Sequence, residues 1–160
     1  MPTTIHATVD ARRSRVEART EGDHFISMDA VAPEGDDSAA APKEALLAAL
    51  AGCTSMDVAS ILRKKRQVAD SYEVDVRAEV ADEHPRVFTT IVVDHRVAGD
   101  VQEEALRRSI ELSATRYCPV IAMLSASVTI EHGYRLTDPA GATRSALVVV
   151  TGPPGVKTDS

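Results

Sequence analysis

The chain has 160 residues, 44% of them hydrophobic, which suffices for one domain with a buried core and no disulfide staples. Its formal net charge of −6 argues against nucleic acid as a main partner, because phosphate binding favours a cationic surface. The N-terminal residues 1–10 lack the charged start and apolar run of a secretory signal, and we identify no apolar stretch of about 18 residues that could cross a bilayer. We therefore expect a cytoplasmic protein with no membrane partner, in a compartment where structural disulfides are rare.

Short strands are expected at the start of the chain. Apolar and polar residues alternate over residues 5–9 and again near residues 26–28, with Glu21-Gly22-Asp23 as a turn between them. Residues 32–41 are rich in Pro, Gly, Asp, Ser and Ala, and this composition predicts a loop.

A long central helix is predicted over residues 43–65. Pro42 suits its first position, Glu44 its first turn, and the basic run 63–66 its C-terminal end, where positive charge is favoured. Spacings of three and four place one stripe of mainly apolar and small residues on the same face of this helix. The stripe comprises Leu46, Ala49, Leu50, Cys53, Met56, Ser60 and Ile61.

The middle of the chain predicts a pair of strands. Residues 71–80 alternate between apolar and charged residues, as a half-buried strand does. After a turn, residues 87–97 are expected to form its antiparallel partner, with Ile91 and Val93 pointing inward.

Two further helices and a strand are expected after that pair. Asp100 followed by Glu103 is a plausible capping arrangement for a second helix, which should run to about Tyr117. A short third helix is expected over residues 119–124 and a last strand over residues 128–136. The order of elements predicts an α+β domain with antiparallel sheet.

The composition changes after residue 136. Two groups of Pro and Gly flank a single apolar run, so we expect residues 1–136 to form the domain and residues 137–160 to be a mostly disordered tail. Within this tail, residues 147–150 could pair with a sheet edge.

The two cysteines lie in different elements. Cys53 lies on the apolar stripe of the long helix, beside Gly52, where small residues would allow another helix to approach closely. Cys118 precedes Pro119, which disfavours helical geometry at residue 118 and suits the first position of the next helix. Cys118 is therefore expected to be the N-cap of that helix, where unpaired N–H groups and the helix dipole favour a thiolate.

These features leave several interpretations open. Both cysteines could be ordinary buried thiols, since free cysteine is among the most buried residue types. A metal site has little support, because there is no Cys-x-x-Cys pattern and no helical pair of histidines. A cysteine–histidine hydrolase is a further alternative, but His95 and His132 lie in predicted strands, where a half-buried or surface imidazole is the usual explanation.

Two segments resemble the cysteine motifs of the OsmC/Ohr superfamily, in particular its YhfA-like branch. Residues 41–62 read APKEALLAALAGCTSMDVASIL, and residues 116–124 read RYCPVIAML. The segments HPRVFT at 84–89 and LSA at 112–114 add support. The resemblance covers about residues 5–135 and leaves out the tail.

The resemblance implies an OsmC-like fold, in which antiparallel sheets wrap around long central helices in an intertwined homodimer. It also implies thiol-dependent reduction of organic hydroperoxides, with Cys53 attacking the peroxide and Cys118 resolving the sulfenic acid as a disulfide. No metal, haem, flavin or other cofactor is implied, and an external dithiol would reduce the pair. The expected partners are thus a second copy of the chain, a small organic hydroperoxide or apolar ligand, and a dithiol.

The sequence also departs from the peroxidase pattern. The family glutamate that follows a proline corresponds to Lys43, and Glu44 lies nine residues before Cys53, near the opposite side of the helix. Asp57, one turn after Cys53, would repel a thiolate, and we interpret it as a polar contact within the dimer. The family's activating arginine could correspond to any of several residues near the N-terminus, namely Arg12, Arg13, Arg15 and Arg19. The alternative is therefore a non-catalytic dimer that binds a small molecule or senses redox state.

Overall fold

The protein is described from a computed structural model that covers residues 2–154. The chain divides into two compact units, Met1–Ala48 and Ala49–Ser160, and each is described by itself.

The first unit contains a small antiparallel sheet with the strand order β1-β2-β3. The strands are β1 (Ile5–Asp10), β2 (Arg15–Thr20) and β3 (Phe25–Met28), as the alternation near the start of the chain predicted. The loop that follows is fastened by Asp29, whose carboxylate accepts hydrogen bonds from the Ser38 backbone N–H (2.9 Å) and hydroxyl (2.7 Å). These bonds hold the pKa of Asp29 below its usual value.

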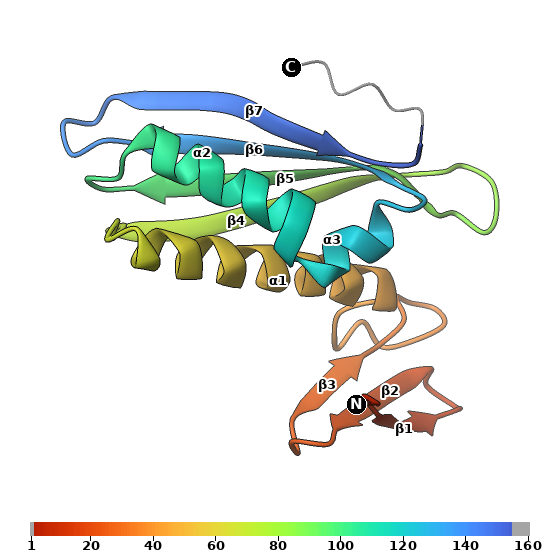
Figure 1. Ribbon diagram of the computed structural model, residues 1–160. Coiled ribbons are helices and arrows are strands. Elements are labelled where there is room, and N and C mark those ends of the chain that lie inside the picture. The colour runs from red at the N-terminus through yellow and green to blue at the C-terminus, as the bar shows by residue number, and fades with distance from the viewer. Residues whose placement is uncertain (1, 155–160) are drawn as a thin grey trace. The chain divides into compact units, whose positions relative to one another are not determined.

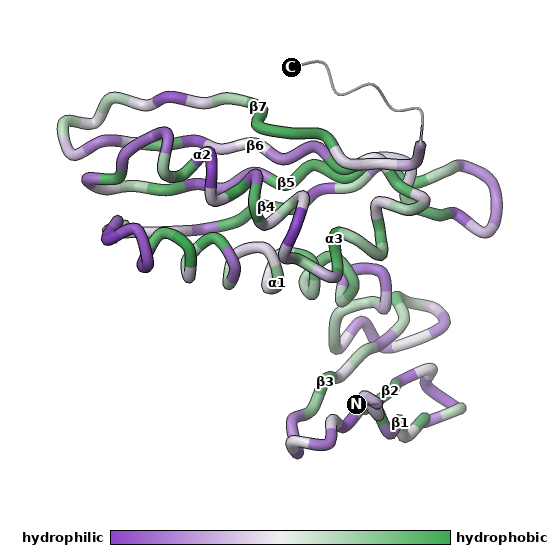
Figure 2. The backbone as a smooth tube through the Cα atoms, in the orientation of Figure 1, coloured by the Kyte–Doolittle hydropathy of each residue, from purple (hydrophilic) through white to green (hydrophobic). Residues whose placement is uncertain are grey.

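The long helix α1 spans Pro42–Lys64. Its start is capped by Glu44, whose Oε2 accepts a hydrogen bond from the Ala41 N–H at 2.8 Å, and this confirms Glu44 as a first-turn residue. Its end carries Arg63 and Lys64, as predicted, and Figure 2 shows this hydrophilic end beside the more apolar turns before it.

The buried face of α1 differs from the predicted stripe. The buried residues are four apart, namely Leu50, Thr54, Val58 and Leu62. Of the predicted stripe, only Leu50 is fully buried, whereas Leu46 is 40% exposed and Met56 is 74% exposed. Helix α1 carries apolar residues on more than one face, so its periodicity does not select the face that packs within the chain.

Helix α1 also corrects the expectation that no segment is long and apolar enough to cross a membrane. It has 23 residues, and an 18-residue window reaches a mean hydropathy of 1.7. The sequence reading missed it because isolated polar residues interrupt the run. A core helix of a soluble protein meets the same criterion, and α1 buries four residues within the protein.

The second unit contains a four-stranded sheet with the order β4-β5-β6-β7. Strands β4 (Ser71–Val80) and β5 (Phe88–Ala98) pair antiparallel as predicted. Strand β6 (Thr129–Thr137) pairs parallel with β5, so the expectation of a purely antiparallel sheet was wrong. Parallel pairing needs a crossover connection, and the helices between β5 and β6 supply it.

Those helices are α2 (Glu103–Leu112), the π-helical turn η1 (Ser113–Tyr117) and α3 (Pro119–Leu124). The predicted end of the second helical segment near Tyr117 is confirmed, and so is the predicted short helix over residues 119–124. The predicted cap is not, because Gln102 is the N-cap and makes no side-chain capping bond.

The core of the second unit lies between the sheet and the helices (Figure 1). The inward residues of β5 include Ile91 and Val93, both fully buried as predicted. One buried cluster joins α1, α2, β5, β6 and the segment before α2; its members are Val58, Leu62, Val97, Val101, Leu106, Ile110, Tyr134 and Leu136. This core fixes α2, and with it the turn that leads to Cys118.

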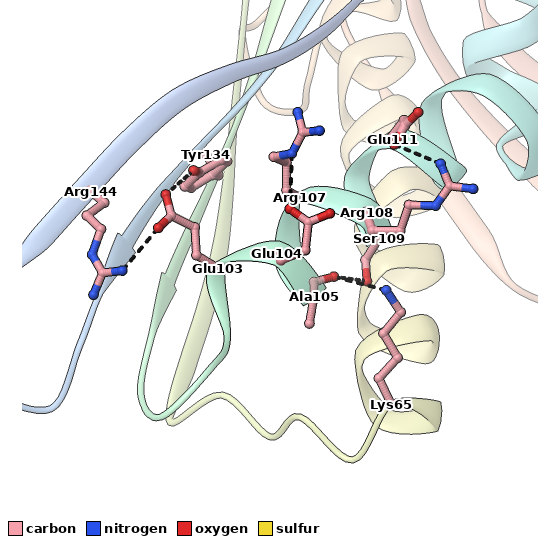
Figure 3. A network of polar contacts seen from close by, with 10 residues as sticks. All are labelled: Lys65, Glu103, Glu104, Ala105, Arg107, Arg108, Ser109, Glu111, Tyr134 and Arg144. Atoms are coloured by element: carbon pink, nitrogen blue, oxygen red, sulfur yellow. Dashed lines mark hydrogen bonds and ion pairs between the residues drawn. The ribbon is translucent and has the colours of Figure 1, made fainter.

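Polar contacts fasten the start of α2 to the sheet (Figure 3). Glu103 accepts hydrogen bonds from the Tyr134 hydroxyl on β6 and from Arg144 Nη1 on the last strand, the latter at 3.0 Å. At the side of α1, Lys65 Nζ donates to the Ala105 carbonyl at 3.4 Å. The helix is thereby held against both neighbours.

The last strand, β7 (Thr143–Thr151), pairs antiparallel with β6. These residues were expected to be mostly disordered, and that expectation is corrected. The predicted pairing of residues 147–150 with a sheet edge is part of this strand. The two groups of Pro and Gly suggested disorder, but they mark the turn before β7 and the end of that strand. Residues 155–160 of the predicted tail lie outside the described residues.

Candidate functional site

Cys53 lies in the middle of α1, on the turn that also carries Thr54 and Asp57. Its side chain is partly buried and its sulfur is a free thiol. The neighbouring Gly52 faces open space, since a Cβ added there would meet no atom within 4 Å. The thiol is therefore placed on a long helix, beside a glycine with open space around it among the described residues.

Cys118 caps the short helix α3, as its position before Pro119 predicted. Its backbone is extended (φ −75°, ψ 107°), and its Sγ accepts a hydrogen bond from the Ile121 N–H at 3.5 Å. The π-helical turn η1 ends at this residue, where the Cys118 N–H bonds to the Ser113 carbonyl at 3.0 Å. Such turns are rare and occur often at functional sites.

Burial controls the acidity of the Cys118 thiol. The residue is 3% exposed. Burial, with a further contribution from its hydrogen bond with Cys53, raises the pKa of Cys118 to about 12, although the N–H groups of Val120 and Ile121 act in the opposite direction. The expectation that the N-cap position favours a Cys118 thiolate was thus wrong. Desolvation of the buried thiol raises its pKa more than the N–H groups of the cap lower it.

Asp57 joins the two cysteines in one cluster. The sulfur atoms of Cys53 and Cys118 and a carboxylate oxygen of Asp57 all lie within 4.8 Å of one another. The fold thus brings together two cysteines that lie 65 residues apart in the sequence. Their proximity is what a dithiol–disulfide couple requires.

A buried hydroxyl pair positions Asp57. Ser113 Oγ donates to Asp57 Oδ2 at 3.1 Å and also lies 3.1 Å from Thr54 Oγ1. Both Thr54 and Ser113 are fully buried. Within this chain the polar contact of Asp57 is with Ser113, and the expected contact within a dimer stays a prediction.

Two cavities adjoin the cluster. The larger, of about 590 Å³, is lined by Cys118, Arg116 and Tyr117 among others. The smaller, of about 380 Å³, is lined by Asp57, Lys64 and Tyr117 among others. Both are large enough for a small organic molecule.

No role was predicted from the sequence for Arg116, Ser113 or Thr54. Arg116 lines the cavity of Cys118, and its guanidinium lies 5.5 Å from the ring centre of Tyr117. Ser113 and Arg116 stand in the two short segments that carry the family resemblance, which is the signal that could have indicated them. Nothing in the sequence pairs Thr54 with Ser113.

The residues considered as activators belong to the first unit. Arg13 forms an ion pair with Asp36 (3.4 Å), and Arg15 donates to Ser38 (3.0 Å). Arg19 pairs with Asp23. These three side chains are all engaged within that unit, to which Lys43 and Glu44 at the start of α1 also belong.

Two histidines are fully buried on the inner face of the sheet, where a half-buried or surface position was expected. His95 Nδ1 lies 2.7 Å from the Tyr72 hydroxyl, and His132 Nε2 lies 3.1 Å from Thr151 Oγ1. The second ring nitrogen of each, His95 Nε2 and His132 Nδ1, has no hydrogen-bond partner among the described residues. Burial lowers the pKa of His95 to about 3, with repulsion from His132 adding to it, and that of His132 to about 4.

The family model for OsmC-like proteins matches residues 35–133, which include both cysteines and Asp57. This chain belongs to the OsmC-like protein family. It is 40% identical over 114 residues to the protein YhfA of Escherichia coli strain K12, an alignment that covers 71% of this chain and 83% of YhfA. The predicted family resemblance is therefore confirmed.

Solved structures confirm the α+β OsmC-like fold. A hypothetical protein from Aquifex aeolicus VF5 superposes with a TM-score of 0.76 at 22% identity, covering 86% of this chain and 98% of that one. The organic hydroperoxide resistance protein OhrB of Bacillus subtilis superposes with a TM-score of 0.60 at 12% identity, covering 84% of this chain and 98% of OhrB. These likenesses show the fold.

Proposed function

We propose that the protein is a thiol-dependent peroxidase that reduces organic hydroperoxides through Cys53 and Cys118 and serves an antioxidant role in the cytoplasm. The observation that carries this proposal is the approach of the two sulfur atoms to within 4.8 Å of each other in one OsmC-like chain. The hydroperoxide resistance function in the name of the structural neighbour OhrB is consistent with it.

The burial of the two cysteines supports their order of action. Cys53 is the more accessible thiol, and Cys118 is buried. In the proposed cycle, the Cys53 thiolate attacks the terminal oxygen of the hydroperoxide, the O–O bond breaks, and the organic part leaves as an alcohol after taking up a proton. Cys53 is then a sulfenic acid.

The second step closes the disulfide. The Cys118 sulfur attacks the Cys53 sulfenic acid, an S–S bond forms, and the hydroxyl leaves as water after the Cys118 proton is transferred to it. An external dithiol then reduces the disulfide, which restores both thiols. The cycle needs no metal or organic cofactor.

Steady-state turnover tests this function. Purified reduced protein should consume cumene hydroperoxide with dihydrolipoamide as the reductant, at least about 100 times faster than dihydrolipoamide alone. Wild-type protein alkylated at its cysteines under native conditions is the matched control. Consumption no faster than the control would contradict the proposal.

A second candidate is a dimer that binds a small molecule or registers redox state without turnover. The raised pKa of Cys118 favours it, because a thiol with a pKa of about 12 is a poor nucleophile at neutral pH. The cavity of about 590 Å³ beside Cys118 would hold the ligand. Under this candidate, the two cysteines of a chain could be oxidised once, but hydroperoxide consumption in the turnover assay would stay at the control rate.

We further propose that the protein works as an intertwined homodimer. Proteins of this family are typically dimeric. The open face of α1 supports this state, because Met56 is 74% exposed and Gly52 leaves space beside it. Leu46 of the same helix is 40% exposed, and an interface would cover both apolar side chains.

The substitution Met56→Glu should therefore shift the protein from dimer to monomer. Burying an unpaired carboxylate at an interface is costly, so the dissociation constant should rise by at least about 100-fold. Light scattering coupled to size-exclusion chromatography measures this, with Val68→Glu as the matched control at another exposed apolar residue. A monomeric wild-type protein, or a dimer that tolerates Met56→Glu unchanged, would contradict the proposal.

A further inference from the structure

The cysteine cluster of the second unit is also suited to a metal ion. Its two sulfur atoms and one carboxylate oxygen come from two separate segments, α1 and the junction of η1 with α3, and lie within 4.8 Å of one another. In a tetrahedral zinc site with bonds of about 2.0 to 2.3 Å, the ligand atoms are roughly 3.3 to 3.8 Å apart. A small contraction would therefore convert the cluster into a three-ligand site.

The charges of the cluster favour a cation. With both cysteines bound as thiolates, the cluster would bring three negative groups within 4.8 Å of one another, and like charges repel at this distance. A divalent cation placed between the three groups replaces each repulsion by an attraction. Asp57 is thus a favourable third ligand.

The ligand atoms are also oriented by their neighbours. Ser113 Oγ donates to Asp57 at 3.1 Å and is itself held by Thr54 at 3.1 Å. The Ile121 N–H points at Cys118 Sγ at 3.5 Å. Hydrogen bonds from a second layer of residues are typical of protein metal sites, where they fix the direction of the ligands.

We propose that the reduced protein binds one zinc ion per chain through Cys53, Asp57 and Cys118. Two sulfur ligands select a thiophilic cation over magnesium or calcium, and the fourth position is left for water. The bound ion would hold both cysteines in the reduced form and keep them from reacting. This inference requires only the reduced thiols and is independent of the proposed peroxidase activity.

Cobalt titration tests the site directly. Protein reduced with a phosphine, freed of metal and titrated with Co²⁺ should develop a thiolate-to-cobalt charge-transfer band that saturates at one ion per chain, and Zn²⁺ should abolish it. Asp57→Asn should weaken Co²⁺ binding by at least about 10-fold, whereas Asp82→Asn, at an exposed carboxylate elsewhere, should leave it unchanged. Absence of the band, or equal affinity in Asp57→Asn, would overturn the proposal.

Alkylation provides a readout that requires no variant. One equivalent of Zn²⁺ should slow the reaction of both wild-type thiols with iodoacetamide by at least about 10-fold. Unchanged alkylation would overturn the proposal even if the Asp57 variant failed to fold. Neither assay contains peroxide, so the metal site and the peroxidase activity are tested separately. A protein that binds cobalt without consuming hydroperoxide has the metal site but not the proposed function. A protein that consumes hydroperoxide without binding cobalt has the proposed function but not the metal site.

Discussion

Cys53→Ser should lower the rate of organic hydroperoxide consumption by at least about 100-fold. A serine hydroxyl is not ionised at neutral pH and cannot accept the peroxide oxygen as a sulfenic acid, so the first step of the proposed cycle is lost. The measurement is steady-state consumption of cumene hydroperoxide with a dithiol reductant. Unchanged consumption would contradict the assignment of Cys53 as the attacking residue.

Cys118→Ser is the matched variant, because it removes the second thiol and leaves the first. This variant should still react with one equivalent of hydroperoxide but should stop at the Cys53 sulfenic acid, which dimedone traps and mass spectrometry detects. Its turnover with a dithiol should be slower than that of the wild type. If dimedone instead labelled Cys118 in the Cys53→Ser variant, the order in which the two cysteines act would be reversed.

Acidification should destabilise the protein strongly between pH 7 and pH 5. The pKa values of His95 and His132 in the folded protein are about 3 and about 4, below the ordinary value of 6.5. The unfolded chain therefore binds protons that the folded chain excludes. The stability this gives is complete above pH 6.5 and is lost as the pH falls toward 4 and then 3.

The expected loss between pH 7 and pH 5 is about 2 kcal/mol for each histidine and about 4 kcal/mol for both. Urea unfolding at one fixed protein concentration measures it at each pH. His95→Gln should remove about half of the pH dependence, whatever it does to stability at pH 7, with His24→Gln at an exposed position as the control. A pH profile that is flat above pH 5 would contradict the burial of both imidazoles.

Elements with strong local signals could be predicted from the sequence. Pro42 and the basic run 63–66 bracket α1, and the alternation over β4 marks a strand with one buried face. Pro119 likewise fixes the start of α3 and the N-cap position of Cys118. Each of these features depends on a residue and its near neighbours.

Other features depend on contacts between distant residues, and no local pattern in the sequence indicates them. The parallel pairing of β5 with β6 follows from the path of the intervening helices, and β7 gains its stability from the neighbouring strand β6. His95 and His132 look like ordinary strand residues until the sheet places them under the helices. The acidity of Cys118 was misjudged for the same reason, since burial is a property of the whole fold.

The candidate site divides in the same way. Cys53 and Cys118 were identified from their two motifs, but the role of Asp57 depended on Ser113, which the π-helical turn brings to α1. The periodicity of α1 did not indicate its buried face, because the helix carries apolar residues on more than one face.

The most direct test of the account is to map the cysteines after one equivalent of cumene hydroperoxide. The reduced wild-type protein should be treated, quenched by alkylation under denaturing conditions, digested and analysed by mass spectrometry. The account predicts rapid loss of both free thiols and a single Cys53–Cys118 disulfide within one chain. Two alkylated cysteines, or a Cys53 oxidised beyond sulfenic acid with Cys118 still free, would contradict it.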